Sequence, residues 1–237
     1  MNSELLSEIL FPSGCKCLIC GAEIAKGNFD VCGNCYVKLP FITGKVCIGC
    51  GEPLYSMSDY CLNCKNTKRY FTSCYAPFTF TDDVVRLIHG LKYGGKKYVA
   101  TTLSNFLLKH FSEKNLSVDV VIPIPLHAAR FKERGFNQSE LLTQSFSKFG
   151  FNVNCDCLVR SKDSNTQTNL SKTERLQNVT NAFRCVNKDA VKNKTVLLID
   201  DVYTTGATFN EASRVLISAG AKQVYCLSVA HTILNNA

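Results

Sequence analysis

Eight cysteines in the first third of the chain have the spacing of metal ligands. They form four Cys-x-x-Cys pairs, and two thiolates placed so closely can reach one ion. A second pair about a dozen residues later completes a tetrahedral four-cysteine site, so the pairs provide for two zinc ions. The pairs are Cys17 with Cys20, Cys32 with Cys35, Cys47 with Cys50, and Cys61 with Cys64.

These sites are expected to be structural rather than catalytic, because an all-cysteine site leaves no open position for water. Free core cysteines or a redox Cys-x-x-Cys motif would have to produce four paired repeats by accident. The sequence leaves open whether consecutive or interleaved pairs share an ion. Cys15 and Cys74 have no partner at this spacing and are interpreted as spare or buried thiols.

A second segment whose residues could carry a chemical function covers residues 195–208. Residues 196–199 are apolar and predict a buried strand, which ends in the adjacent acids Asp200 and Asp201. A loop of small residues then opens into a helix whose apolar residues repeat at helical spacing. The loop residues are Thr204, Thr205, Gly206, Ala207 and Thr208.

This order of strand, acids, loop and helix suits a phosphorylated sugar. Unpaired N–H groups and the helix dipole at a helix N-terminus favour an anion such as phosphate. Asp200 and Asp201 repel phosphate, so they need ribose hydroxyls or a magnesium ion instead. The simpler interpretation is a strand that ends in two solvated acids before an N-cap threonine.

The elements that position these residues alternate between strand and helix. Residues 75–80 and 118–124 predict strands, and apolar residues at helical spacing predict helices around residues 84–91 and 103–107. The second of these strands is nearly all apolar, as in a parallel strand covered on both faces. The predicted fold class is therefore α/β.

Residues 196–208 resemble the loop that binds 5-phosphoribosyl-1-pyrophosphate (PRPP) in type I phosphoribosyltransferases. Together with the cysteine pairs, further motifs identify the chain as similar to the ComF family of competence proteins, over nearly its whole length. The resemblance implies a parallel sheet flanked by helices, with a small N-terminal zinc-ribbon domain. The motifs are Asp119-Val-Val-Ile-Pro-Ile-Pro-Leu-His127, Arg134-Gly-Phe-Asn-Gln138, Gln167, Leu170-Ser171, Glu174-Arg175 and Asn178-Val179.

The resemblance also implies roles for single residues. Asp200 and Asp201 hold the ribose and magnesium, and residues 204–208 hold the 5-phosphate. The pyrophosphate lies near the loop after Pro125 and near Arg175, and residues 165–178 form a flap over the site. Arg130, Lys132 and Arg134 are cations suited to pyrophosphate, and the less favoured alternative is that they form a solvated helix face.

Composition sets the domain organisation. The chain has 237 residues, 46% of them hydrophobic and 19% charged, which is typical of a globular protein. We expect a double zinc ribbon over residues 1–70 and a phosphoribosyltransferase domain over residues 71–237. No apolar run is long enough for a membrane span, and no basic segment precedes the short apolar stretch at the N-terminus. The expected location is the cytosol, where reduced thiols bind metal.

The distribution of charge leaves the function open. Residues 79–237 carry twenty basic and thirteen acidic residues, an excess of +7 that suits either a phosphorylated small molecule or a nucleic acid. The segment from Leu91 to Tyr98 is basic and aromatic, so it is either a single-strand-binding loop or a solvated turn. His127 either serves the leaving group or is simply solvated.

Three function classes follow. The first is an enzyme that transfers a phosphoribosyl group, although Thr204 stands where many purine-using relatives carry an acid and cannot act as that base. The second, implied by the ComF resemblance, is a protein that handles imported single-stranded DNA beside a competence helicase without turnover. The third is a regulator that senses PRPP. No acceptor substrate follows from the sequence.

Overall fold

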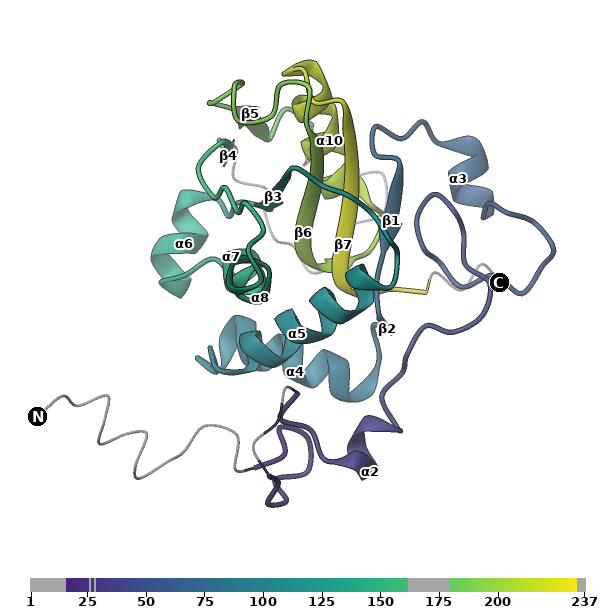
Figure 1. The fold of residues 1–237 in the computed structure, drawn as a ribbon, viewed down its shortest axis with the longest axis vertical. Coiled ribbons are helices and arrows are strands. Elements are labelled where there is room, and N and C mark those ends of the chain that lie inside the picture. The colour runs from purple at the N-terminus through teal and green to yellow at the C-terminus, as the bar shows by residue number, and fades with distance from the viewer. Residues whose placement is uncertain (1–15, 26, 28, 162–179, 234–237) are drawn as a thin grey trace, which may run out of the picture.

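The computed structural model describes residues 16–25, 27, 29–161 and 180–233 (Figure 1). At its centre lies a five-stranded sheet in the order β1-β7-β6-β3, with β2 also paired to β7, and every pairing is parallel. A separate antiparallel pair joins β4 and β5. The strands are β1 (Ser73–Tyr75), β2 (Phe78–Thr79), β3 (Val120–Pro123), β4 (Leu158–Arg160), β5 (Phe183–Cys185), β6 (Thr195–Tyr203) and β7 (Gln223–His231).

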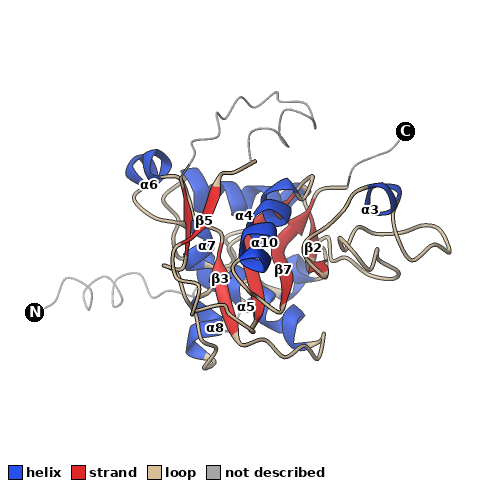
Figure 2. Cartoon of the chain, turned by 90° about the horizontal axis from the view of Figure 1, so that it is seen from above, coloured by secondary structure: helices blue, strands red, loops and turns tan. Residues whose placement is uncertain are grey.

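Helices cover both faces of this sheet, as Figure 2 shows with α10 on one side and α4 and α5 on the other. The described helices are α2 (Gly33–Tyr36), α3 (Leu62–Asn66), α4 (Asp82–Tyr93), α5 (Val99–Ser112), α6 (Ala128–Arg134), α7 (Gln138–Leu141), α8 (Gln144–Lys148) and α10 (Ala207–Ser218). No helix among the described residues is long and apolar enough to cross a bilayer.

Strand β6 runs through the middle of the molecule and serves two apolar cores. Val196 and Leu198 pack into the core on the α10 side, whereas Leu197 and Ile199 pack into the core with α4 and α5. Successive residues of a strand point to opposite faces, so an uninterrupted apolar run is what a doubly covered parallel strand requires. The sheet therefore holds the end of β6 rigidly between two layers.

The first cysteine cluster packs on the outer side of α4 and α5 (Figure 1). Phe29 stacks on Phe106 of α5 with ring centroids 4.3 Å apart, and Leu18 and Ile19 also contact this core. The hydroxyl of Thr102 donates to Asp30 at 3.2 Å. This part of the chain is thus attached to the helical layer and not to the sheet.

The second cysteine cluster shares the core of the sheet. Cys47, Cys50 and Cys61 are buried in the same apolar cluster as residues of β6 and α10. The amide of Cys74 in β1 donates to the carbonyl of Gly49 at 2.9 Å, which joins the two backbones directly. A division into domains at residue 70 remains a prediction. The shared core makes separate folding of the two parts a point for experiment.

The α/β class and the expected helices are confirmed, and three boundaries differ from expectation. The strand expected over residues 75–80 is divided into β1 and β2, because Pro77 has no N–H to donate to the ladder. The strand expected over residues 118–124 is β3, which is shorter. Strand β6 continues past the acids to Tyr203, and α10 begins at Ala207, so Ala207 and Thr208 belong to its first turn.

Candidate functional site

The structure groups the eight paired cysteines into two clusters of consecutive pairs. In each cluster the four sulfur atoms lie within 4.8 Å of one another. The Sγ atoms of Cys20 and Cys32 are 3.7 Å apart, and those of Cys50 and Cys61 are 3.6 Å apart. Four sulfurs at ~2.3 Å from one zinc ion would be about 3.8 Å apart in a tetrahedron. The clusters thus have the dimensions of zinc sites, with consecutive pairing.

Backbone donors and thiol acidity also fit metal binding. The amides of Cys32 and Cys61 each donate to a sulfur of their own cluster at 3.3 Å. Burial would raise the pKa of Cys17, but amides of Cys20 and Cys32 outweigh it and lower the pKa to about 6. Burial and neighbouring thiols raise the pKa of Cys35 to about 12, because four thiols cannot all ionise in one place without a cation.

We expect about two zinc ions per chain in protein purified without chelators, since each cluster supplies four cysteine ligands. Elemental analysis of the freshly reduced protein measures this ratio. A value near one would mean that only one cluster holds metal, and absence of zinc would contradict the assignment of both.

The acid pair lies at the carboxyl end of β6, and each carboxylate has its own partner. Oδ1 of Asp200 accepts from the hydroxyl of Ser139 at 2.8 Å and from the amide of Asp201 at 2.9 Å. Asp201 is buried, and its Oδ2 lies 2.8 Å from the ammonium of Lys92 in α4. Helices α7 and α4 therefore fix the two carboxylates from different directions.

These surroundings change the acidity of Asp200. Burial and the adjacent charge of Asp201 raise its pKa to about 7, although Lys92 and the Ser139 hydroxyl act in the opposite direction. Burial lowers the pKa of Lys92, but Asp201 outweighs it, so the net shift is upward and the ammonium stays charged. At neutral pH Asp200 is therefore close to the midpoint of its titration.

The loop after β6 has the geometry of an anion cradle. Gly206 has a left-handed backbone with φ of 77° and precedes α10, whose N-terminus is capped by no side chain. The buried hydroxyl of Thr205 accepts from the amide of Ala207 at 3.4 Å. The N-terminus of α10 thus follows, after a short loop, the strand that carries both carboxylates, and unpaired amides of a first helical turn favour an anion.

The predicted cations are placed only in part. Arg134 ends α6, donates to Oε1 of Gln138 at 2.5 Å, and lies over the ring of Tyr93 at 5.2 Å. Tyr93 is the neighbour of Lys92 in α4, so Arg134 contacts the helix that carries the partner of Asp201. Arg130 lies in the same helix, whereas Arg175 and the expected flap over residues 165–178 lie outside the described residues.

Lys92 and Ser139 were not predicted as site residues. Lys92 belongs to the basic segment from Leu91 to Tyr98, whose charge is equally typical of a solvated turn or a DNA contact. Ser139 directly follows the motif that ends at Gln138. His127 is the N-cap of α6, where its Nδ1 accepts from the amide of Ala129 at 3.3 Å.

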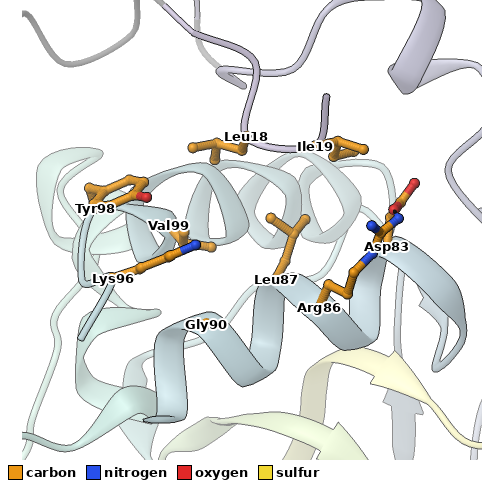
Figure 3. Close-up of a pocket in the computed structure, with 9 residues that line it drawn as sticks. All are labelled: Leu18, Ile19, Asp83, Arg86, Leu87, Gly90, Lys96, Tyr98 and Val99. Carbon is orange, nitrogen blue, oxygen red and sulfur yellow. Dashed lines mark hydrogen bonds and ion pairs between the residues drawn. The ribbon is translucent and has the colours of Figure 1, made fainter. Parts of the chain in front are cut away.

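The rest of the basic segment faces a different space. Lys96 and Tyr98 line a cavity of about 230 Å³ between the first cysteine cluster and helices α4 and α5 (Figure 3). Leu18 and Ile19 close one side of this cavity, and Arg86 reaches it from α4. None of its lining residues belongs to the acid pair or to residues 204–208, so the cavity is separate from the candidate phosphate site.

Comparison with known proteins agrees with both halves of this arrangement. Residues 6–65 match the double zinc ribbon domain, and residues 100–236, more than half of the chain, match the phosphoribosyl transferase domain. Competence protein F of Haemophilus influenzae is 29% identical over 217 residues, which cover 88% of this chain and 93% of that protein.

Two further relatives have similar coverage. DNA utilization protein YhgH of Escherichia coli K12 is 29% identical over 89% of this chain and 95% of its own length. Competence protein ComFC of Bacillus subtilis is 28% identical over 86% of this chain and 89% of its own length. The chain therefore belongs to the phosphoribosyl transferase domain family, joined to a double zinc ribbon, and is a homologue of the ComF-type competence and DNA utilization proteins.

Proposed function

We propose that this protein binds PRPP together with Mg²⁺ at the end of β6. The observation that carries the proposal is the adjacency of two partnered carboxylates, Asp200 and Asp201, to the left-handed Gly206 and the uncapped N-terminus of α10. One ligand class, a phosphorylated ribose, matches both the acidic and the anion-binding part.

In this proposal each part of the site meets one part of the ligand. Asp200 and Asp201 accept from the ribose hydroxyls, and residues 204–208 donate to the 5-phosphate. Arg130, Arg134 and Arg175 neutralise the pyrophosphate. Carboxylate oxygens suit Mg²⁺, which is usually held by few carboxylates and by the phosphates of its substrate.

If turnover occurs, it is a pentosyl transfer in which a nucleophile attacks C1 of the ribose and pyrophosphate leaves. Asp200, Asp201 and Arg175 would then orient the two ends of the reacting bond. We propose no purine salvage, because Thr204 cannot take a proton from an incoming base.

The names of the relatives support a role in DNA uptake, in the manner of natural transformation. We propose that the protein acts there in the cytosol, where reduced cysteines can bind zinc, and beside a helicase that moves the incoming strand. The fold itself does not dictate this role.

Isothermal titration of the zinc-loaded protein with PRPP and MgCl₂ tests the proposal directly. We expect saturable binding of one PRPP per chain. A parallel titration with ribose 5-phosphate separates the phosphate and diol contacts from the pyrophosphate contacts. If neither PRPP nor ribose 5-phosphate gave a heat of binding, the result would contradict a phosphoribosyl site.

The affinity for PRPP should depend on pH. Ribose hydroxyls donate to ionised carboxylates, and the pKa of Asp200 is about 7, so binding should weaken as pH falls from 8 to 6. Lys92→Met removes a cation that lowers this pKa, so the midpoint of the pH dependence should move upward. Titrations at five pH values measure both midpoints, with Lys148→Met as a control at an exposed position of α8. Identical midpoints for Lys92→Met and the parent would contradict this electrostatic coupling.

Single-stranded DNA binding is the second candidate. It is favoured by the names of the relatives and by exposed Tyr93 and Tyr98 beside Lys96 and Lys97. The logarithm of affinity should then fall with the logarithm of salt concentration at about −0.7 per neutralised phosphate. Replacing Lys96 and Lys97 by alanine should make this slope shallower, as fluorescence anisotropy with an oligonucleotide would measure. No binding at low salt would exclude this candidate.

A regulator that senses PRPP would use the same site. It differs from the enzyme in one result: PRPP would bind without being consumed when nucleobases, amines and oligonucleotides are offered as acceptors.

A further inference from the structure

The chain between β3 and α7 leaves the sheet as an excursion that carries helix α6. We call residues 124–137 the cationic excursion, because Arg130 and Arg134 lie within it. It begins at Ile124, directly after β3, and ends at Asn137, directly before α7. Nδ2 of Asn137 donates to the carbonyl of Ile124 at 3.1 Å. This one hydrogen bond therefore closes the base of the excursion.

The side chain of Asn137 uses both of its polar atoms and is only 3% exposed. Nδ2 also donates to Oε1 of Glu140 at 3.3 Å, and Oδ1 accepts from the amide of Ser139 at 3.0 Å. An asparagine amide offers two donors and one acceptor on a short side chain. Asn137 can therefore cap α7 and hold the end of β3 at the same time.

Ser139 continues this attachment to the acid pair. Its buried hydroxyl donates to Oδ1 of Asp200 at 2.8 Å. The return connection is made by the backbone, since the amide of Ile124 donates to the carbonyl of Ile199 at 2.8 Å, and Ile199 directly precedes Asp200. The contacts form a closed ring of hydrogen bonds around the ends of β3 and β6. Its members are Asn137, Ser139, Asp200, Ile199 and Ile124.

This ring sets two positions together. A carboxylate is planar, so the bond that holds Oδ1 of Asp200 also sets the direction of its Oδ2. The bond to Ile124 sets the place where the cationic excursion leaves the sheet. Opening either bond leaves a buried polar group without its partner, which is unfavourable. The ring therefore resists small changes in the separation between Asp200 and the excursion.

That separation matters for a ligand that spans both parts. In the proposed function the ribose of PRPP meets Asp200 and the pyrophosphate meets the cations of the excursion. Two linked groups bind together more tightly than either alone only where the spacing of their subsites matches the ligand. A side chain that controls this spacing would affect the joined ligand more than its separate parts.

We propose that Asn137 is a positioning residue that holds the cationic excursion at a fixed distance from Asp200, so that the ribose and the pyrophosphate of one ligand bind together. The proposal rests on the proposed function for the identity of the ligand. The ring of hydrogen bonds itself does not depend on that identity.

The test uses the full-length zinc-loaded protein with Mg²⁺ and three ligands: PRPP, ribose 5-phosphate and inorganic pyrophosphate. Asn137→Ser keeps a side-chain acceptor for the start of α7, but its shorter side chain does not span to the carbonyl of Ile124. Asn152→Ala is the matched control. Asn152 also donates through Nδ2 to a backbone carbonyl beside β3, that of Asp119 at 3.4 Å, but at the opposite end of the strand.

In Asn137→Ser we expect the affinity for PRPP to fall at least about tenfold, while the affinities for ribose 5-phosphate and pyrophosphate stay within about threefold of the parent. The NMR signal of the Asp201 amide should shift without ligand, because this amide donates to Oδ1 of Asp200 at 2.9 Å and reports on its orientation. Asn152→Ala should match the parent in all four measurements.

The outcomes separate this proposal from the proposed function. If the parent binds PRPP and Asn137→Ser binds it within about twofold of the parent, the positioning role is wrong while the phosphoribosyl site stands. Equal losses for all three ligands would also overturn the role, because they indicate general damage to the site and not a lost spacing.

If the parent binds none of the three ligands, the proposed function fails and the Asp201 amide decides on the ring. A shifted signal in Asn137→Ser then supports the connection between Asn137 and Asp200, and an unchanged signal overturns it. Should Asn137→Ser fail to fold, Ser139→Ala opens the ring at its bond to Asp200, and the same outcomes apply to that variant.

Discussion

Cys47→Ser should unfold most of the chain at physiological temperature, whereas Cys32→Ser should cost one zinc ion and leave the sheet folded. Cys47 and its cluster belong to the same buried core as β6 and α10, so losing this metal opens the centre of the molecule. Cys32 belongs to the cluster that packs on the outer side of α4 and α5, where fewer contacts depend on it.

The magnitudes support this asymmetry. Structural zinc supplies an apparent ~10–16 kcal/mol to small metal-dependent domains, and an ordinary domain is stable by only ~5–15 kcal/mol. Loss of a ligand inside the main core can therefore exceed the whole free energy of unfolding. Loss of a ligand in a peripheral cluster is confined to the residues that the cluster organises.

Zinc content and thermal unfolding followed by circular dichroism distinguish the two variants. We expect one zinc and a melting temperature close to the parent for Cys32→Ser, and a loss of the cooperative transition for Cys47→Ser. Ser58→Ala serves as a control in the loop between Cys50 and Cys61, which joins the two cysteine pairs of the second cluster. Equal destabilisation by both cysteine variants would show that the ribbons and the sheet form one cooperative unit, against a division at residue 70.

Local patterns were sufficient to predict the two groups of paired cysteines and the strand, loop and helix around residues 195–208. Each cysteine pair spans four residues, so spacing alone shows which sulfurs can share an ion, although not which two pairs do. The acids and the loop are likewise contiguous from Asp200 to Thr208, and their order along the chain is their order in space.

Contacts between distant segments could not be predicted in this way. The bond from Ser139 to Asp200 spans 61 residues, and the pairing of Lys92 with Asp201 depends on how α4 packs against the sheet. From the sequence, Lys92 in its basic segment is expected to be solvated. Only the tertiary structure shows that it pairs with the buried Asp201. The division between β1 and β2 did have a local signal in Pro77, which the aromatic and β-branched neighbours outweighed.

The packing of the second cysteine cluster in the core of the sheet also depends on contacts between distant segments, so the sequence did not predict it. Cysteine spacing specifies the local turn that holds two metal ligands, but not the surface against which the metal site packs. The close contact of Gly51 with Cys74, where a Cβ would lie 2.5 Å from the carbonyl oxygen, depends on residues from two separate segments. A sequence pattern for a ribbon is therefore compatible with either a separate module or a part of the main core.

Replacing Asp200 or Asp201 by asparagine should affect stability in opposite directions while both changes weaken PRPP binding. Asp200 is partly buried, and desolvation together with the adjacent charge of Asp201 raises its pKa to about 7. Between pH ~4 and 7 the folded protein holds a proton that the unfolded chain has released, so wild-type stability falls as pH rises through this range. Asp200→Asn removes this dependence, and each pKa unit is worth ~1.4 kcal/mol, so we expect a gain of ~1–3 kcal/mol at pH 8 and about a third of that gain at pH 5.

Asp201→Asn has the opposite effect, because it leaves the ammonium of Lys92 without its carboxylate. Removing one member of a buried pair costs ~3–5 kcal/mol, and Lys92 retains some solvent contact, so a loss of ~1–3 kcal/mol is expected. Denaturant unfolding at pH 5 and pH 8 measures both changes, with Asp156→Asn as an exposed control. The same sign of change for both variants at pH 8 would contradict this account of the acid pair.

The double replacement tests the binding site itself. Asparagine nearly preserves the shape of each aspartate, so the protein with both asparagines should remain folded. Charge-assisted bonds to ribose hydroxyls are worth ~1.5–3 kcal/mol each, so PRPP affinity should fall at least about tenfold. Thr208→Val should also weaken binding, through the phosphate end, whereas Asp156→Asn should leave it unchanged. A folded double variant that binds PRPP and Mg²⁺ as tightly as the parent would show that the end of β6 does not hold the ribose.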